Sequence, residues 1–235
     1  MMPSSEPSAD VRSEIAVAAA RLIADEGCDY ATARRRAARD VIGAGRELRS
    51  LMPDHAQIES ALRTHLRIFA GERQPQLLAA LRQLAVQVMA RLAQFNPHLS
   101  GAVLNGTATE HSDLNLLLFT DSAKEVEMFL LDEGVEFDVF EGPQGPAGAE
   151  ETVRFVVQPA RSSGMPLRVG VNLAILPVDA IRVAARQRSL EPGLHPIEQS
   201  GRASLAALRV LLAQQAQPVA PAQPLAQPQA HGQQR

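Results

Sequence analysis

The residue types best suited to chemistry lie together in one stretch of the chain, GAVLNGTATEHSDLN. It contains Gly101 and Gly106, and it ends in Ser112, Asp113, a leucine and Asn115. Glycine turns let backbone N–H groups approach and bind phosphate oxygens, and carboxylates hold the Mg²⁺ ions used in phosphoryl transfer. Side chains two residues apart on a strand share a face, so Asp113 and Asn115 are expected to act together. The stretch therefore indicates a phosphoryl-transfer site with an amide in place of one carboxylate.

The chain before this stretch is predicted to be helical, because its apolar residues recur at helical spacing. Asp29 is expected to cap the second helix, and Asp54 with Gln57 forms a capping-box pattern at the start of the third, whose apolar face includes Phe69. Gly27 is placed where a left-handed residue would end the first helix. The four expected helices cover about residues 13–26, 29–43, 54–71 and 75–96.

After Pro97 the pattern changes to short apolar runs bounded by turns, which is typical of strands. One run is separated from the next by SAKEVEMFLLDEG, which Ser122 can cap and which reads as a crossover helix. A strand, a helix and a strand leading into a hairpin predict an α/β (α+β) fold with a mixed sheet. A further helix is expected from Ser200. The expected strands are GAVLNG, DLNLLLFT, VEFDVF, TVRFVVQ and LRVGVNLAIL, with loops at 141–148 and 161–164.

Three regions follow from these patterns. Residues 1–72 are predicted to form an N-terminal helical region, and residues 73–213 a second domain built on the sheet. Residues 214–235 are rich in Pro, Ala and Gln without a periodic apolar face, so they are predicted to be a disordered tail.

Composition limits the class of protein. The 235 residues are 46% hydrophobic, enough for a sizeable core, and the net charge of −3 does not indicate a nucleic-acid partner. A single cysteine excludes an internal disulfide, and the apolar runs are too short to span a bilayer. We expect a soluble cytoplasmic protein without a membrane partner, and the sequence does not set its oligomeric state.

The stretch from Gly101 to Leu116 resembles the signature of the nucleotidyltransferase superfamily, whose fold is shared by DNA polymerase beta and small bacterial nucleotidyltransferases. There the pattern is Gly-Ser, a second glycine, and then Ser-Asp-X-Asp at the start of an apolar strand. More narrowly, residues 13–212 look like a set of uncharacterised bacterial nucleotidyltransferase-like proteins with the same N-terminal helices. The resemblance implies a nucleotidyltransferase-like mixed-sheet domain with flanking helices.

Residue by residue, the resemblance implies a partial site. Asp113 matches the first carboxylate and is the candidate catalytic residue and metal ligand, with Ser112 beside it. Gly101 and Gly106 match the two motif glycines, and Thr107 is expected to supply a hydroxyl to the phosphates. These residues, together with Asn115, make up the expected nucleotide-binding set.

Two departures weaken the implied chemistry. Ala102 stands where the family has a phosphate-contacting serine, and Asn115 stands where it has the second carboxylate. The third carboxylate position is expected on a later strand, at Asn172 or at Asp138. Mg²⁺ favours carboxylate oxygen over the neutral amide oxygen, so binding of Mg²⁺ or Mn²⁺ is expected to be weak.

Two functions remain open at this point. One is an enzyme that transfers a nucleotidyl group from an NTP to a hydroxyl of an unknown acceptor, whether protein, RNA or small molecule. The other is a pseudoenzyme, a catalytically degenerate module on the same fold that binds nucleotide or another protein. The basic residues 34–36 and Arg39 would fit a nucleic-acid contact, but a solvated helix face is the more common role.

Overall fold

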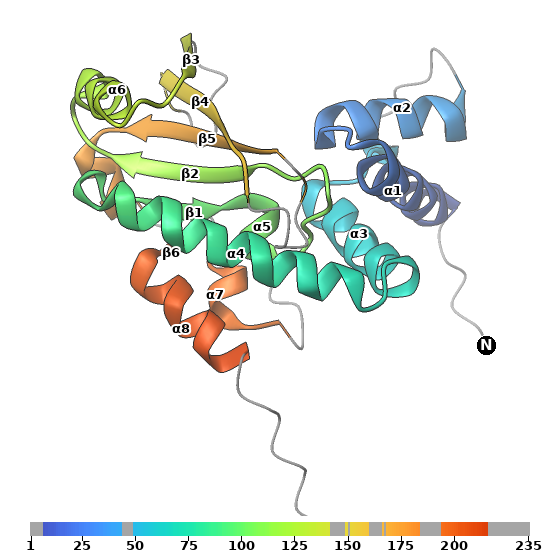
Figure 1. Cartoon of the computed structure of the whole chain (residues 1–235). Coiled ribbons are helices and arrows are strands. Elements are labelled where there is room, and N and C mark those ends of the chain that lie inside the picture. Colours follow the sequence, from blue (N-terminus) through green and yellow to red (C-terminus); the bar gives the residue numbers. More distant parts are fainter. Residues whose placement is uncertain are drawn as a thin grey trace, which may run out of the picture.

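The computed structural model describes residues 7–43, 49–141, 149, 151–159, 166, 168–183 and 194–215. In these residues, helices surround one sheet of six strands in the order β3-β4-β5-β2-β1-β6 (Figure 1). The sheet is mixed, since β2 and β5 are parallel while β4 runs antiparallel to both β3 and β5. This architecture confirms the predicted α/β (α+β) class.

The N-terminal helices form a unit with its own core. They are α1 (Pro7–Glu26), α2 (Tyr30–Ile42), the short 3-10 helix η1 (Arg49–Leu51) and α3 (His55–Phe69). The Asp29 side chain accepts hydrogen bonds from the backbone of Ala31 and Thr32, and Asp54 and Gln57 form the expected capping box. Fully buried alanines at 33 and 37 let α2 pack closely on its neighbours. The prediction for Phe69 was wrong, because the last turn of α3 leaves its ring 74% exposed.

The strands are short except in the middle of the sheet. Their bounds are β1 (His98–Ser100), β2 (Leu114–Phe119), β3 (Phe137–Glu141), β4 (Glu151–Val157), β5 (Val169–Leu176) and β6 (Ala203–Ser204). The β1 strand pairs antiparallel with both β2 and β6. Four of the five expected strand runs coincide with a strand of the sheet, and β1 and β6 were not predicted.

The fifth run, GAVLNG, is a correction. Residues Gly101–Asn105 form the short helix α5, between a left-handed Gly101 (φ 72°) and a left-handed Gly106 (φ 85°). The strand that precedes it is β1, which ends at Ser100. Apolar runs this short do not distinguish a strand from a buried helical turn, and here the flanking glycines decide the outcome.

The remaining helices cover the sheet or connect its strands. They are α4 (Arg73–Arg91), η2 (Ala93–Phe95), α6 (Ala123–Asp132), η5 (Val178–Arg182), α7 (Pro196–Gln199) and α8 (Leu205–Gln215). The predicted crossover helix is α6, and the Ser122 side chain caps it as expected by accepting from the backbone of Glu125. The expected fourth helix ends at Arg91, before η2, and the helix expected from Ser200 begins at Leu205.

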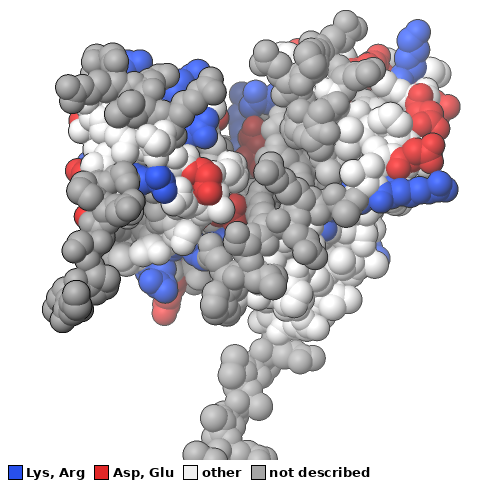
Figure 2. Space-filling model, turned by 180° about the vertical axis from the view of Figure 1, so that it is seen from behind, with Lys and Arg blue, Asp and Glu red and all other residues white. Residues whose placement is uncertain are grey.

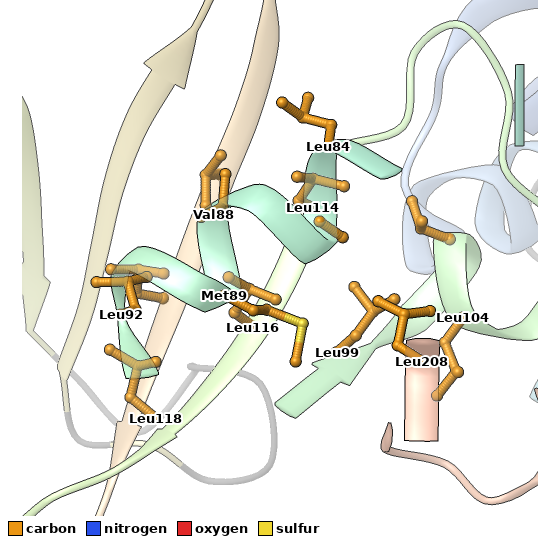
Figure 3. Close-up of a cluster of buried hydrophobic side chains, with 14 of the residues drawn as sticks. Leu84, Val88, Met89, Leu92, Leu99, Leu104, Leu114, Leu116, Leu118 and Leu208 are labelled. Carbon is orange, nitrogen blue, oxygen red and sulfur yellow. The ribbon is translucent and has the colours of Figure 1, made fainter. Parts of the chain in front are cut away.

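The main core lies between α4 and the sheet (Figure 3). Figure 3 shows side chains of α4, at positions 84, 88, 89 and 92, gathered over Leu114, Leu116 and Leu118 of β2. Because strand side chains alternate, the intervening residues of β2, Asn115 and Leu117, point to the opposite face of the sheet. A smaller apolar cluster around Leu117 and Phe119 covers part of that opposite face.

Some predictions lie outside the described residues. These are the loop at 142–148, the turn at 161–164 and all but the first two residues of the tail predicted at 214–235, which are part of α8. Among the described residues, we find no helix with both the length and the apolar character needed to cross a membrane.

Candidate functional site

A row of polar side chains crosses the sheet on the face turned away from α4. Each member is paired in register with the next on the adjacent strand, and residues paired in this way project from the same face of a sheet. The row runs Ser100, Asn115, Asn172, Arg154 and Asp138. The site expected from the sequence therefore lies on one face of the sheet, with Asp113, two residues before Asn115, at its side.

Three hydrogen bonds hold the centre of this row together. The Asn172 amide nitrogen donates both to Asp113 Oδ2 (3.2 Å) and to Asn115 Oδ1 (3.1 Å). A guanidinium nitrogen of Arg154 lies 3.3 Å from the same Asp113 oxygen. Of the two candidates for the third position, the structure thus brings Asn172 to Asp113 and Asn115, and leaves Asp138 two strands away from Asn172.

Glycines make room for this arrangement. A Cβ at Gly170, two residues before Asn172 on the same face, would lie 2.3 Å from Asp113 Oδ1, so no larger residue fits without moving that carboxylate. A Cβ at Gly101 would lie 3.0 Å from the Asn115 amide nitrogen. The first motif glycine therefore supports Asn115 by close backbone approach, while Ser100 donates its hydroxyl to the Asn115 carbonyl.

In the loop between Gly106 and Asp113, polar groups form hydrogen bonds within the protein. Thr107 is 1% exposed, and its hydroxyl donates to Asn105 Oδ1 over 2.7 Å. The backbone N–H groups of Gly106 and Thr107 both donate to the Ala102 carbonyl. Ser112 accepts a hydrogen bond from the backbone of Thr109. The donors expected at Gly106 and Thr107 are therefore used within the loop, and the structure offers neither of them to a phosphate.

Residues that the sequence did not single out hold this loop in place. Arg82 of α4 is fully buried and donates to the carbonyls of Val103 (2.9 Å) and Leu104 (2.7 Å), and it pairs with Glu198 of α7 (2.7 Å). Gln74 donates to the carbonyl of Gly106. A single charged residue in an apolar helix face carries no chemical signal by itself, and this is why sequence reasoning missed Arg82.

The N-terminal helices also contact the loop. A Cβ on Gly27, at the end of α1, would lie 2.8 Å from His111 Cβ. Arg63 of α3 donates to the Asn105 carbonyl over 3.2 Å. Figure 2 views the molecule from behind Figure 1 and shows a recess between the helical lobe and the sheet lobe, with basic and acidic side chains side by side in it.

The donor set does not fit a pair of divalent cations. It consists of one carboxylate, two amides and a guanidinium, so the only negative charge at the centre is paired with a fixed positive charge. Amide oxygens are neutral and weaker ligands for Mg²⁺ than carboxylates. In the part of the chain that the structure describes, no three or more His, Cys, Asp or Glu side chains are grouped so that they could hold a metal ion.

Three members of the site were not found by sequence reasoning: Ser100, Arg154 and Gly170. Arg154 is a lone charge in the apolar run TVRFVVQ. The alternation of this run does not decide from which face of the sheet its side chain projects. Its place next to Asp113 depends on the pairing of β4 with β5, which the sequence does not specify.

Comparison of the chain with protein-family models, with curated proteins and with solved structures gives no match. A fold class alone does not define an activity, so the functional argument rests on the site.

Proposed function

We propose that this protein is a catalytically degenerate, nucleotidyltransferase-like module that binds a nucleotide through its phosphates without a metal pair. The observation that carries this proposal is the contact between Arg154 and Asp113, with Asn115 and Asn172 in place of two carboxylates. The motif around Asp113 supports the superfamily resemblance, and the charges around it argue against two-metal catalysis.

The physical reason lies in the charge balance of the site. Two Mg²⁺ ions normally offset both the carboxylates and the triphosphate. Here the site has one carboxylate, Asp113, and the guanidinium of Arg154 offsets its charge. That guanidinium is half exposed and can still reach a ligand. Guanidinium groups form strong, charge-assisted hydrogen bonds to phosphate oxygens. A phosphate group could therefore exchange with Asp113 as the partner of Arg154.

Titration calorimetry tests this proposal. Each NTP is titrated into the protein in EDTA and again in Mg²⁺, with an Arg154→Gln variant alongside. Binding in EDTA is expected, and loss of the guanidinium should weaken it about tenfold, the scale of one charge-assisted hydrogen bond. Arg209→Gln, which changes an exposed arginine on α8, is the matched control and should bind as the unaltered protein does.

Nucleotide binding that appears only with Mg²⁺ would contradict the proposal. An affinity that is the same in Arg154→Gln as in the unaltered protein would also contradict it.

One observation favours a second candidate, a metal-dependent enzyme. Asp138 is exposed and lies on the same face as Asp113, so this face carries a second carboxylate at the end of the polar row. Such an enzyme would use Mg²⁺ or Mn²⁺ to transfer a nucleotidyl group from an NTP to a hydroxyl of a protein, RNA or small-molecule acceptor. Release of pyrophosphate in Mn²⁺, abolished by Asp113→Ala and by Asp138→Asn, would support it over the degenerate module.

A further inference from the structure

One edge of the sheet is formed by β3 (Phe137–Glu141). Strand β3 is the outermost strand and pairs only with β4 among the described residues. An edge strand presents unpaired N–H and C=O groups on its free side, which another extended chain can use. The edge is therefore a surface with a defined direction of hydrogen bonding.

The same edge is unusually apolar for an exposed surface. Met128 and Leu131 of α6 are 64% and 65% exposed, and Phe140 of β3 is 54% exposed. Beside them lies a hollow of about 430 Å³, lined by Leu131, Gly134, Val135, Glu136 and Phe137. A hollow next to a free strand edge can take a side chain from a chain that pairs with the strand.

Acidic residues surround this apolar surface. Residues 124–141 contain seven of the 26 Asp and Glu residues of the chain and one Lys, although the net charge of the whole chain is only −3. In Figure 2 acidic side chains gather at the upper right, on the side of the molecule where α6 and β3 lie, with basic side chains above and below them. One of these acidic residues, Glu133, pairs with Arg91 over 2.7 Å, and the acidic residues of the segment still exceed its single Lys by six. An excess of one charge at a docking surface selects partners of the opposite sign.

The hollow and the polar row lie on opposite faces of β3. Phe137 and Asp138 are consecutive, so Phe137 points toward α6 and the hollow, while Asp138 points to the face of the polar row. An added strand would alternate in the same way. Its aliphatic residues would face the hollow, and its basic residues would face Asp138, on the side of β3 that also carries Phe140.

We infer that this β3 edge surface, made of Leu131, Glu136, Phe137, Asp138 and Phe140, binds an extended segment of a partner protein. In that segment, Lys or Arg alternates with aliphatic residues. The segment adds a strand to β3, fills the hollow with one aliphatic side chain and places its cations beside the carboxylates. This inference does not depend on nucleotide binding.

Two other occupants fit less well. Residues 216–235 contain four prolines, no Lys and a single Arg at the last position, so they bring little positive charge and several residues without a backbone N–H. A second copy pairing through the same strand would bring the same acidic residues face to face, and like charges repel.

A labelled synthetic peptide in which Lys alternates with Val is the probe, and fluorescence anisotropy with the full chain is the measurement. Binding should be saturable and should weaken as salt is raised, because exposed charges are screened. A peptide in which Glu replaces Lys should not bind. Two further Lys-Val peptides carry N-methyl groups, one on its odd residues and the other on its even residues. Alternate N–H groups of a strand point to the same edge, so only one of these peptides keeps the N–H groups that pair with β3. The other should lose binding.

A substitution in the hollow completes the test. Leu131→Ser removes the aliphatic side chain without adding charge and should weaken binding about thirtyfold, the scale of an interface hot spot. Val17→Ser on α1 is the matched control, because Val17 is also exposed and apolar, at 57%, and it should leave binding unchanged. Circular dichroism checks that both variants remain folded.

Equal binding of the Glu-Val peptide, or unchanged binding of both N-methylated peptides, would overturn the inference. So would a stable dimer of the full chain that Leu131→Ser dissociates, because the occupant would then be a second copy.

Discussion

At the scale of single residues, the pair of Asp113 and Arg154 defines the site. Their side chains are 30% and 50% exposed, so solvent screens the pair and its contribution to the free energy of unfolding is small, about 0–1 kcal/mol. Its importance lies in the chemistry of the site. It places a cation beside Asp113, the carboxylate that the sequence predicts as a metal ligand.

Gly170 is the residue that makes this pair fit. Gly170→Ala should destabilise the protein by about 1–3 kcal/mol, the usual cost of overpacking, because the new Cβ would lie 2.3 Å from Asp113 Oδ1. Urea unfolding measures the loss. In an Asp113→Ala background the same substitution should cost much less, and an equal cost in both backgrounds would contradict the assigned clash.

The sequence predicted part of this site for a clear physical reason. Period-two alternation places Asp113 and Asn115 on one face, and of the two residues expected at the third position, Asn172 and Asp138, the structure brings Asn172 to them. Arg154 could not be predicted, because it depends on which strands pair and in what register. Thr107 was assigned to the phosphates without regard to Asn105, whose side chain competes locally for its hydroxyl.

At the scale of elements, capping residues and apolar spacing predicted most helices, because those signals are local. The strands and α-helices that were missed are short: β1 and β6 have three and two residues, and α5 and α7 have five and four. Their position depends on contacts with distant parts of the chain. One of these is the bond between Arg82 and Glu198, 116 residues apart in sequence.

Arg82 joins α4, α5 and α7, so its loss should be severe. Arg82→Met should lower the free energy of unfolding by about 3–5 kcal/mol, because Glu198 would remain as a buried charge without its partner. Calorimetric or urea unfolding measures this change. A loss no larger than that of Arg209→Gln would show that the buried network does not hold these helices together.

Strand β1 should make stability depend on pH. Burial, and to a lesser degree the charge of Arg202, lowers the pKa of His98 from its usual 6.5, while a hydrogen bond to the Asn96 carbonyl opposes the shift. The folded state therefore favours the neutral ring. The stabilising effect is present above pH 6.5 and is lost as the pH falls from there to the lowered pKa of the folded state.

Unfolding of the unaltered protein and of His98→Gln across this range provides the check. The free energy of unfolding of the unaltered protein should fall as the pH drops below about 6.5, and that of the variant should fall less. Parallel curves would mean that His98 does not contribute to the pH dependence.

At the scale of the whole molecule, two separate cores are joined next to the site. The N-terminal helices pack around one cluster and the sheet around another, and Asn105 of α5 and His111 of the following loop contact the first unit. The helical lobe therefore supports the loop that leads into Asp113. The sequence predicts a helical region packed on the sheet domain, but it does not show which residues make the contact.

Gly27→Ala tests this contact. It should destabilise the protein by about 1–3 kcal/mol, because Gly27 has φ 67° and its Cβ would lie 2.8 Å from His111. Gly43→Ala is the matched control, since Gly43 has φ 84° and nothing within 4 Å of the added Cβ. Thermal unfolding should show the larger loss for Gly27→Ala, and equal losses would mean that the contact with His111 adds nothing.

The central claim is that amides and a guanidinium replace the ligands of a metal pair. Its most direct test is titration with Mn²⁺, followed by electron paramagnetic resonance, of the unaltered protein and of a variant with Asn115→Asp, Asn172→Asp and Arg154→Gln. The account predicts at most weak Mn²⁺ binding in the unaltered protein and clear binding in the variant, lost when Asp113→Ala is added. Tight binding of Mn²⁺ by the unaltered protein, abolished by Asp113→Ala alone, would contradict it.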